Sequence, residues 1–165
     1  TEPVEGVRRE TRGMLVRPAT PDDAEGLPDL HSAAAEAFGP DAYPPEQVDQ
    51  WSNRGERTPE GYPVDESGEH VTGWVRDGEA AGFGHLAVEA GEVHAVYVHP
   101  DHARRGVGSA LLAELEGFAR GQGIETLALQ SSLNAVEFYE RSGYERVSAG
   151  ESPGGLPVVE FRKRL

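Results

Sequence analysis

Cysteine is absent from this chain of 165 residues. Its absence excludes disulfides, thiolate metal ligands and a cysteine nucleophile. No apolar run approaches the roughly 18 residues that a membrane-spanning helix needs, so we expect no membrane partner. The first 13 residues, TEPVEGVRRETRG, contain no apolar stretch of the kind found in secretory signals. These absences together favour a soluble, cytoplasmic protein.

Positive charge is scarce. The chain has 15 basic residues, of which only Lys163 is a lysine, against 29 acidic residues, and its net charge is −14. An acidic surface can steer cationic substrates toward a protein. Because the acidic residues are scattered rather than clustered, we favour the other explanation, a halophilic-type acidic composition suited to a salt-rich cytoplasm. No basic stripe is visible, which argues against nucleic-acid binding.

The length fits one domain, which we place at residues 14–165 behind a flexible tail of residues 1–13. Alternating and helical periods predict strands at 14–17, 70–76, 80–88, 92–99, 126–130, 144–148 and 158–162. They predict helices at 20–38, 44–51, 107–122 and 134–142, the first of them kinked or split at Pro28. This order indicates an α/β (mixed α+β) fold, in which about four helices flank a central mixed sheet of about seven strands.

The segment HPDHARRGVGSALLAEL combines a strand end, a short loop and a helix start. A helix start presents unpaired N–H groups and a partial positive charge, which suit a phosphate. The segment adds two arginines, two glycines and a hydroxyl, namely Arg104, Arg105, Gly106, Gly108 and Ser109. A Walker A loop would need a lysine here, and a dinucleotide fingerprint would need a glycine at Leu111. Taken alone, the pattern predicts only an anion site at a helix start.

Two separated motifs make the chain resemble the GCN5-related N-acetyltransferase (GNAT) family. The family's pyrophosphate loop, [QR]-x-x-G-x-[GA], is similar to residues 103–108, although Ala103 stands where the family prefers Gln or Arg. A second family motif resembles residues 134–144, NAVEFYERSGY, and residues 14–23 resemble the family's first strand and helix. The resemblance therefore covers about residues 14–165, and it implies a GNAT-like acyl-CoA N-acyltransferase fold.

The resemblance implies acetyl-CoA as the acetyl donor, with no metal. The donor would lie between strands 92–99 and 126–131, one of which pairs with its pantetheine arm. The residues implied in binding it are Val96, Tyr97, Val98, Arg104, Arg105, Gly106, Val107, Gly108, Ser109, Asn134 and Tyr139. Asn134 can also cap its own helix, with Glu137 at the third position. The acceptor can be a small amine or amino acid, a peptide N-terminus or a protein lysine, and homodimerisation is left open.

Acetyl transfer by direct attack of an amine needs a base, donors to the developing oxyanion and an acid for the departing thiolate. The resemblance makes Tyr139 the general acid and the N–H of Val98, or of a neighbour, the oxyanion donor. For the base, Glu92, His94 and His85 all remain open. Strict alternation would place Glu92 and His94 on the same strand face as Val96 and Val98, and a β-bulge would change that order.

Two alternatives to an acetyltransferase are a CoA-binding sensor without turnover and a nucleotide- or dinucleotide-binding protein. The polar segment 52–68 is either a lid on the acceptor side or a surface excursion. His99 and His102 flank a Pro-Asp pair, but no third ligand is evident, so we reject a metal there.

Overall fold

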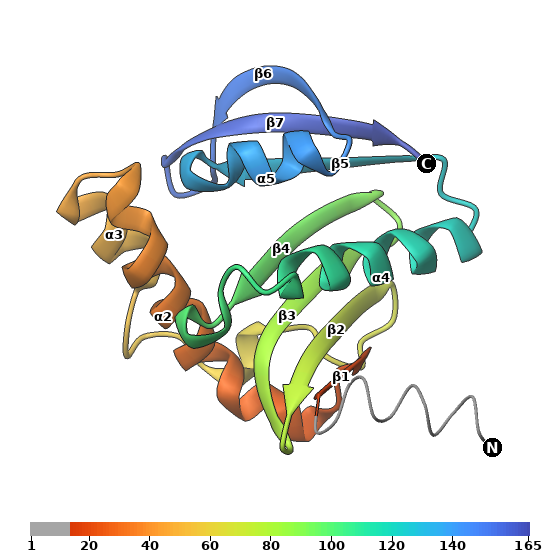
Figure 1. The fold of residues 1–165 in the computed structure, drawn as a ribbon, viewed down its shortest axis with the longest axis horizontal. Coiled ribbons are helices and arrows are strands. Elements are labelled where there is room, and N and C mark those ends of the chain that lie inside the picture. The colour runs from red at the N-terminus through yellow and green to blue at the C-terminus, as the bar shows by residue number, and fades with distance from the viewer. Residues whose placement is uncertain (1–13) are drawn as a thin grey trace.

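The computed structural model describes residues 14–165, so the predicted tail at 1–13 lies outside the described part. Seven strands form one sheet in the order β1-β2-β3-β4-β5-β7-β6. The strands are β1 (Met14–Pro18), β2 (Glu69–Arg76), β3 (Glu79–Ala87), β4 (Glu92–Val98), β5 (Thr126–Ser132), β6 (Glu145–Glu151) and β7 (Pro157–Arg164). The α-helices are α2 (Leu27–Phe38), α3 (Pro45–Ser52), α4 (Val107–Gly121) and α5 (Val136–Arg141). The predicted mixed sheet with flanking helices is confirmed (Figure 1).

Short 3-10 helices join several of these elements, namely η1 (Pro21–Gly26), η2 (Gly39–Asp41), η3 (Pro59–Gly61), η4 (Pro100–His102) and η5 (Leu133–Ala135). The predicted first helix is split into η1 and α2, as Pro28 suggested. Pro28 lies in the first turn of α2, where a missing N–H costs nothing. No helix within residues 14–165 is long and apolar enough to cross a membrane.

The sheet consists of two sets of strands that are paired with each other over only two residue pairs. Strands β1 to β4 are antiparallel neighbours, and β5, β7 and β6 form a second antiparallel set. The two sets are joined by the parallel pair β4 and β5, which is in register only at Glu92 with Ala128 and at Val93 with Leu129. Beyond these two pairs the strands diverge, and Figure 1 shows β4 and β5 running apart.

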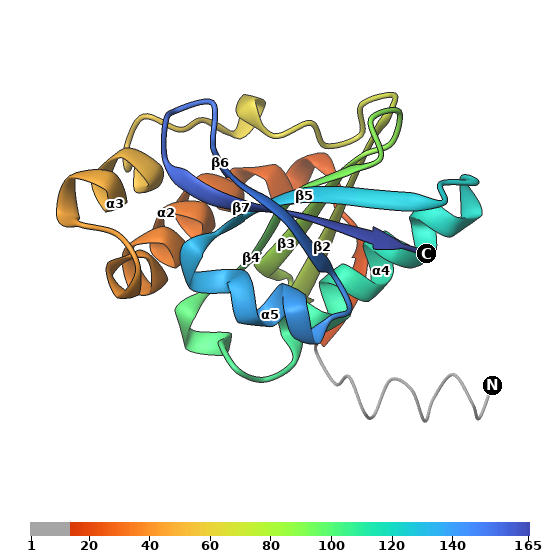
Figure 2. The same cartoon turned by 90° about the horizontal axis from the view of Figure 1, so that it is seen from above.

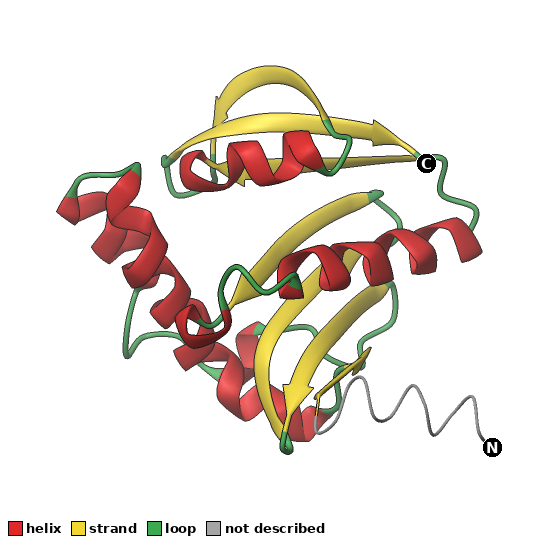
Figure 3. Ribbon diagram, in the orientation of Figure 1, coloured by secondary structure: helices red, strands yellow, loops and turns green. Residues whose placement is uncertain are grey.

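Helices cover both faces of the sheet (Figures 2 and 3). On one face, α4 and α5 pack on a core that includes Leu86, Leu115 and Phe161, each at most 1% exposed. On the other face, Leu27 and Leu30 of α2 pack on β2 and β3. Helix α4 lies close to β3 because β3 carries glycine at the contact. A Cβ added at Gly84 would come within 2.9 Å of the Leu115 side chain.

The one lysine lies in a polar network under this core. The Lys163 ammonium donates to Glu116 Oε2 at 3.1 Å and to the Ser142 carbonyl at 2.9 Å. Tyr144 donates its hydroxyl to the same carboxylate at 2.8 Å. The Glu116 side chain is only 10% exposed, so these partners replace the hydrogen bonds that water would otherwise give its carboxylate. The network therefore ties α4, α5 and β7 together.

Candidate active site

The edge of β4 that faces β5 presents backbone groups without strand partners. The His99 N–H donates to the Ala81 carbonyl of the preceding strand at 2.9 Å. Since successive N–H groups of a strand point to opposite edges, those of Val98 and Val96 face away from β3. Beyond Val93, β5 no longer pairs with this edge. The edge is therefore open to an extended amide chain, which could add to it as a further strand would.

A β-bulge in β4 overturns the expected side-chain alternation. Val93 pairs with Leu86 and Ala95 pairs with His85, which leaves His94 as the extra residue. Val96 and Val98 consequently pack toward α4, together with Val93. Glu92 lies on the opposite face from Val93 and lines the cleft described below. The prediction that Glu92 and His94 share a face with Val96 and Val98 is therefore wrong, because the bulge inserts one residue between the two pairs.

The bulge brings the three candidate bases together on the face away from α4. The His94 Nε2 lies 3.1 Å from Glu92 Oε2, and both side chains are about half exposed. The His85 ring lies 5.0 Å from the His94 ring and is paired with Glu69 at 2.8 Å. Burial lowers the pKa of His85, although the hydrogen bond to Glu69 offsets part of this effect. Glu92 and His94 line the cleft, whereas His85 stands behind His94.

A cleft of about 1040 Å³ lies where β4 and β5 diverge. Its walls come from β4, β5, β7, the helices α2 and α3, and the loop between β6 and β7. Tyr139 of α5 also lines it, although the residue is only 7% exposed. Within residues 14–165 the Tyr139 hydroxyl makes no hydrogen bond, and burial raises its pKa well above the ordinary value. A buried, protonated hydroxyl therefore faces the cleft without a protein partner.

The start of α4 supplies the predicted anion site. Its first helical hydrogen bond runs from the Ala110 N–H to the Gly106 carbonyl at 3.0 Å. The three N–H groups before it, those of residues 107–109, therefore have no acceptor within the helix. Gly106 has a φ of 78° and Arg104 a φ of 62°, so the loop turns twice through the left-handed region. The Val107 side chain is buried in the core at 4% exposure, which leaves only its backbone for a ligand.

The exposed side chains of this loop are Arg104, Arg105 and Ser109, which stand around the free N–H groups. Ala103, where the GNAT motif favours Gln or Arg, is partly exposed and offers no polar side chain. The arginines are the cationic side chains of the loop, in a chain with few of them. The loop therefore combines a backbone cradle with two charges that can move toward an anion.

Asn134 does not cap its helix, and that prediction is wrong. The chain enters α5 through η5, whose cap residues Ser132 and Ala135 make no side-chain cap hydrogen bond. Asn134 lies inside this 3-10 turn rather than at the N-cap of α5. Its Oδ1 is buried and has no hydrogen-bond partner among residues 14–165. An orphaned buried acceptor of this kind fits a ligand N–H donor.

Several cleft residues carry no sequence motif and were not predicted. Trp51 donates its indole N–H to the Tyr97 hydroxyl at 3.1 Å, and the His31 ring lies 4.4 Å from the Tyr97 ring. The Tyr62 hydroxyl pairs with His31 Nδ1 at 3.2 Å. Burial, assisted by the nearby charge of Arg57, lowers the pKa of His31 to about 3. These residues form an aromatic wall on the α2 side of the cleft, and the wall contains a neutral imidazole.

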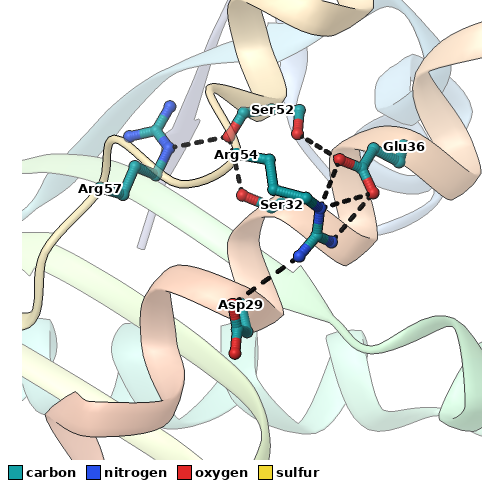
Figure 4. Close-up of polar contacts among 6 residues, drawn as sticks. All are labelled: Asp29, Ser32, Glu36, Ser52, Arg54 and Arg57. Atoms are coloured by element: carbon teal, nitrogen blue, oxygen red, sulfur yellow. Dashed lines mark hydrogen bonds and ion pairs between the residues drawn. The ribbon is translucent and has the colours of Figure 1, made fainter.

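Arg57 also lines this wall, held by a network around the end of α3 (Figure 4). The Ser52 hydroxyl donates to Glu36 at 2.6 Å, and the Ser52 carbonyl accepts from Ser32 at 2.8 Å. Arg54 holds the same Glu36 carboxylate at 2.8 Å. Arg57 donates from Nε to the Ser52 carbonyl at 3.3 Å. Segment 52–68 is thus anchored beside the cleft by its first residues, and Tyr62 and Val64 pack on the α2 core.

The family follows from a comparison with known domains, because the model of the acetyltransferase (GNAT) domain matches residues 40–165. The chain belongs to the GNAT family. A mycothiol acetyltransferase from Nocardiopsis dassonvillei is 33% identical over 111 residues, which cover 55% of this chain and 34% of the relative. An uncharacterised N-acetyltransferase from Methanocaldococcus jannaschii is 35% identical over 60 residues, covering 34% of this chain and 26% of that one. The matches thus span about a third or less of these two relatives.

Solved GNAT structures share the whole fold. A GCN5-related N-acetyltransferase from Rhodopseudomonas palustris superposes with a TM-score of 0.79 at 28% identity, covering 92% of this chain and 95% of that one. PaiA of Thermoplasma acidophilum, solved with coenzyme A, gives 0.70 at 20% identity, with 92% and 99% covered. YncA of Salmonella typhimurium, solved with acetyl-CoA, gives 0.70 at 22% identity, with 93% and 94% covered. The predicted family and fold are confirmed.

The residues present fit coenzyme A. The α4 start offers free N–H groups and two arginines to a pyrophosphate. The open edge of β4 offers N–H and C=O groups to an amide-containing arm, and the orphaned Asn134 Oδ1 offers it an acceptor. A Cβ added at Gly108 would lie 3.4 Å from the Phe138 ring, so glycine lets the start of α4 pack closely against α5. Within the described residues, no group of three or more His, Asp or Glu side chains could hold a metal.

Proposed function

We propose that this chain is an N-acetyltransferase that moves an acetyl group from acetyl-CoA to a primary amine by direct attack. The proposal rests on three neighbouring features, namely the free N–H groups at the start of α4, the open edge of β4, and the cleft. The open edge of β4 leads from the free N–H groups of α4 into the cleft. The same cleft is lined by Tyr139 and by the Glu92–His94 pair.

The donor side is built by backbone groups more than by side chains. When bound, acetyl-CoA supplies the acetyl group as a thioester. In the proposal, the α4 start with Arg104 and Arg105 holds its pyrophosphate, and the Val96 backbone pairs with its amide arm. The Val98 N–H points from the open edge and stabilises the oxyanion, because a backbone donor is fixed before the reaction begins.

On the acceptor side, we assign the removal of a proton from the ammonium to Glu92 and His94 acting as a pair. Their hydrogen bond of 3.1 Å lets either residue pass a proton to the other, and both are exposed enough to exchange it with water. Tyr139 supplies the proton to the departing thiolate. Its raised pKa keeps the hydroxyl protonated throughout the neutral range.

The test is release of free CoA from acetyl-CoA with a panel of amines, in low and high salt. We expect turnover with at least one amine, and a large loss of kcat/KM in Glu92→Gln or His94→Gln that higher pH partly restores. Binding of acetyl-CoA with no CoA release for any amine would instead support a CoA-binding sensor. Stabilisation by ATP or NAD, but not by acetyl-CoA, would contradict the proposal.

A further inference from the structure

The cleft contains a cationic side chain that has no anionic partner. Arg57 is partly buried in the aromatic wall and donates from Nη2 to the Trp51 carbonyl at 2.8 Å and from Nε to the Ser52 carbonyl at 3.3 Å. A guanidinium has five N–H donors, so these two bonds leave donors unused. Within residues 14–165, no carboxylate lies within ion-pair distance of Arg57. Its neighbour Arg54, by contrast, is held by Glu36 and Asp29.

An unpaired arginine is unexpected here, because acidic residues outnumber basic ones by 29 to 15. The other cation that lines the cleft, Arg162, is exposed on β7 and stands next to Glu145 across the strand pair. His31 adds no charge beside Arg57, because burial and Arg57 itself hold its pKa at about 3. Arg57 is therefore the one fixed positive charge of the aromatic wall.

Carboxylates also line the cleft. Glu92 lines it at the start of β4, and Glu151 and Glu160 line it from the β6–β7 hairpin. Trp51, which accepts a hydrogen bond from Arg57 through its carbonyl, contacts Tyr97 of β4. Tyr97 lies three residues after His94, so the two positions are about 10 Å apart along the strand. The cleft thus offers a cation and aromatic rings on its α2 side, and the Glu92 carboxylate beside His94 at the start of β4.

We propose, resting on the acetyltransferase function above, that the acceptor is a zwitterionic amine whose carboxylate binds Arg57 while its ammonium faces Glu92 and His94. The substrate class is an α-amino acid or a short peptide with a free carboxylate. Arg57 is a specificity-determining residue in this arrangement. A guanidinium holds a carboxylate through two parallel hydrogen bonds, which fixes the acceptor's orientation as well as its charge.

The experiment compares matched acceptors that differ only in the carboxylate. Phenylalanine, leucine and a dipeptide would each be measured beside the corresponding carboxamide and the decarboxylated amine. We expect kcat/KM to be roughly 10- to 100-fold higher for the carboxylates, the range given by one charge-assisted hydrogen-bonding contact. Arg57→Gln should remove that preference by lowering kcat/KM for the carboxylates while leaving the carboxamides within about threefold. Arg57→Lys, which keeps the charge but loses the fork, should retain part of the preference.

The control is Arg54→Gln, which removes the same charge from the same segment. It breaks the ion pair with Glu36, but it should leave the ratio of kcat/KM for carboxylates to kcat/KM for carboxamides unchanged. A second readout does not depend on turnover. The carboxylates should raise the melting temperature of the CoA-bound wild type, and not that of the Arg57→Gln variant.

The outcomes separate the two proposals. Acetylation of amines without a preference for carboxylates, or an equal loss for both acceptor classes in Arg57→Gln, would overturn the zwitterion proposal and leave the acetyltransferase function intact. Binding of acetyl-CoA with no turnover of any amine would count against the acetyltransferase function itself. If Arg57→Gln fails to fold, the carboxylate preference of the wild type is compared with that of Arg57→Lys. A smaller preference in Arg57→Lys would support a bidentate contact with the carboxylate, and an equal preference would overturn it.

Discussion

Replacing Tyr139 by phenylalanine separates catalysis from folding more cleanly than any other substitution in this chain. The Tyr139 ring packs in the core beneath β5 and β7, with its centre 5.7 Å from that of Tyr144 and 6.1 Å from that of Phe161. Phenylalanine retains those contacts. The hydroxyl has no hydrogen-bond partner within residues 14–165, so removing it orphans no other polar group.

The two magnitudes follow from this geometry. Because no hydrogen bond is broken and a buried polar atom is removed, the free energy of unfolding should change by less than about 1 kcal/mol or rise slightly. Loss of a general acid should lower kcat by about 10² to 10⁴, which is roughly 2.7 to 5.5 kcal/mol of transition-state stabilisation. The affinity for acetyl-CoA should stay within a few-fold, since the ring still lines the cleft.

The assay suits this protein. With no cysteine in the chain, a thiol reagent detects released CoA without background from the enzyme. Urea unfolding would be measured on the same samples. A decrease of kcat below about threefold, with stability unchanged, would refute the assignment of Tyr139 as the acid. An equal loss of activity and stability would show that the hydroxyl serves packing instead.

Three further predictions concern stability. Lys163→Met leaves the Glu116 carboxylate without its cationic partner, so the free energy of unfolding measured in urea titrations should fall by about 2–4 kcal/mol. A change below about 1 kcal/mol would show that the Lys163–Glu116 pair does not stabilise the fold. Gly84→Ala brings a Cβ to within 2.9 Å of the Leu115 side chain of α4. The free energy of unfolding should fall by about 1–3 kcal/mol in the same measurement, and no change would mean that α4 can move away from β3 without loss of stability. His31 has a folded pKa of about 3, below its unfolded value of about 6.5, so its contribution is complete above pH 6.5 and is lost as the pH falls toward 3. That loss should amount to about 2 kcal/mol between pH 7.5 and pH 5, and it should disappear in His31→Phe, whereas an unchanged slope in this variant would assign the titration elsewhere.

Local sequence signals predicted the elements well. Alternation and helical periodicity gave the order of strands and helices, and the glycines before α4 indicated where that helix begins. These signals act over a few residues, so they survive without knowledge of the tertiary structure. Pro28 likewise indicated the break between η1 and α2, because its missing N–H has a local effect.

The acceptor side could not be predicted in the same way. Whether Glu92 and His94 share a face with Val96 depends on the bulge, which results from the pairing of β4 with β3 and leaves no mark in the strand's own sequence. Arg57 and Trp51 lie in a polar segment and a short helix, and only tertiary packing places them beside Tyr97. Asn134 was misassigned because a 3-10 turn precedes α5, as often happens at helix N-termini, and it moves the helix start beyond Asn134.

The paired ammonium of Lys163 has a chemical consequence for the proposed acetyltransferase. It is the only lysine of the chain, and its ammonium is bound by Glu116 and the Ser142 carbonyl. Acetyl-CoA reacts slowly with exposed lysines of most proteins, and a transferase works continuously in its presence. This chain therefore offers the thioester no lysine whose ammonium is free and fully exposed. We therefore expect little acetylation of the enzyme's own lysine during turnover. In an assay with an added protein acceptor, lysine acetylation detected by mass spectrometry can then be assigned to the acceptor.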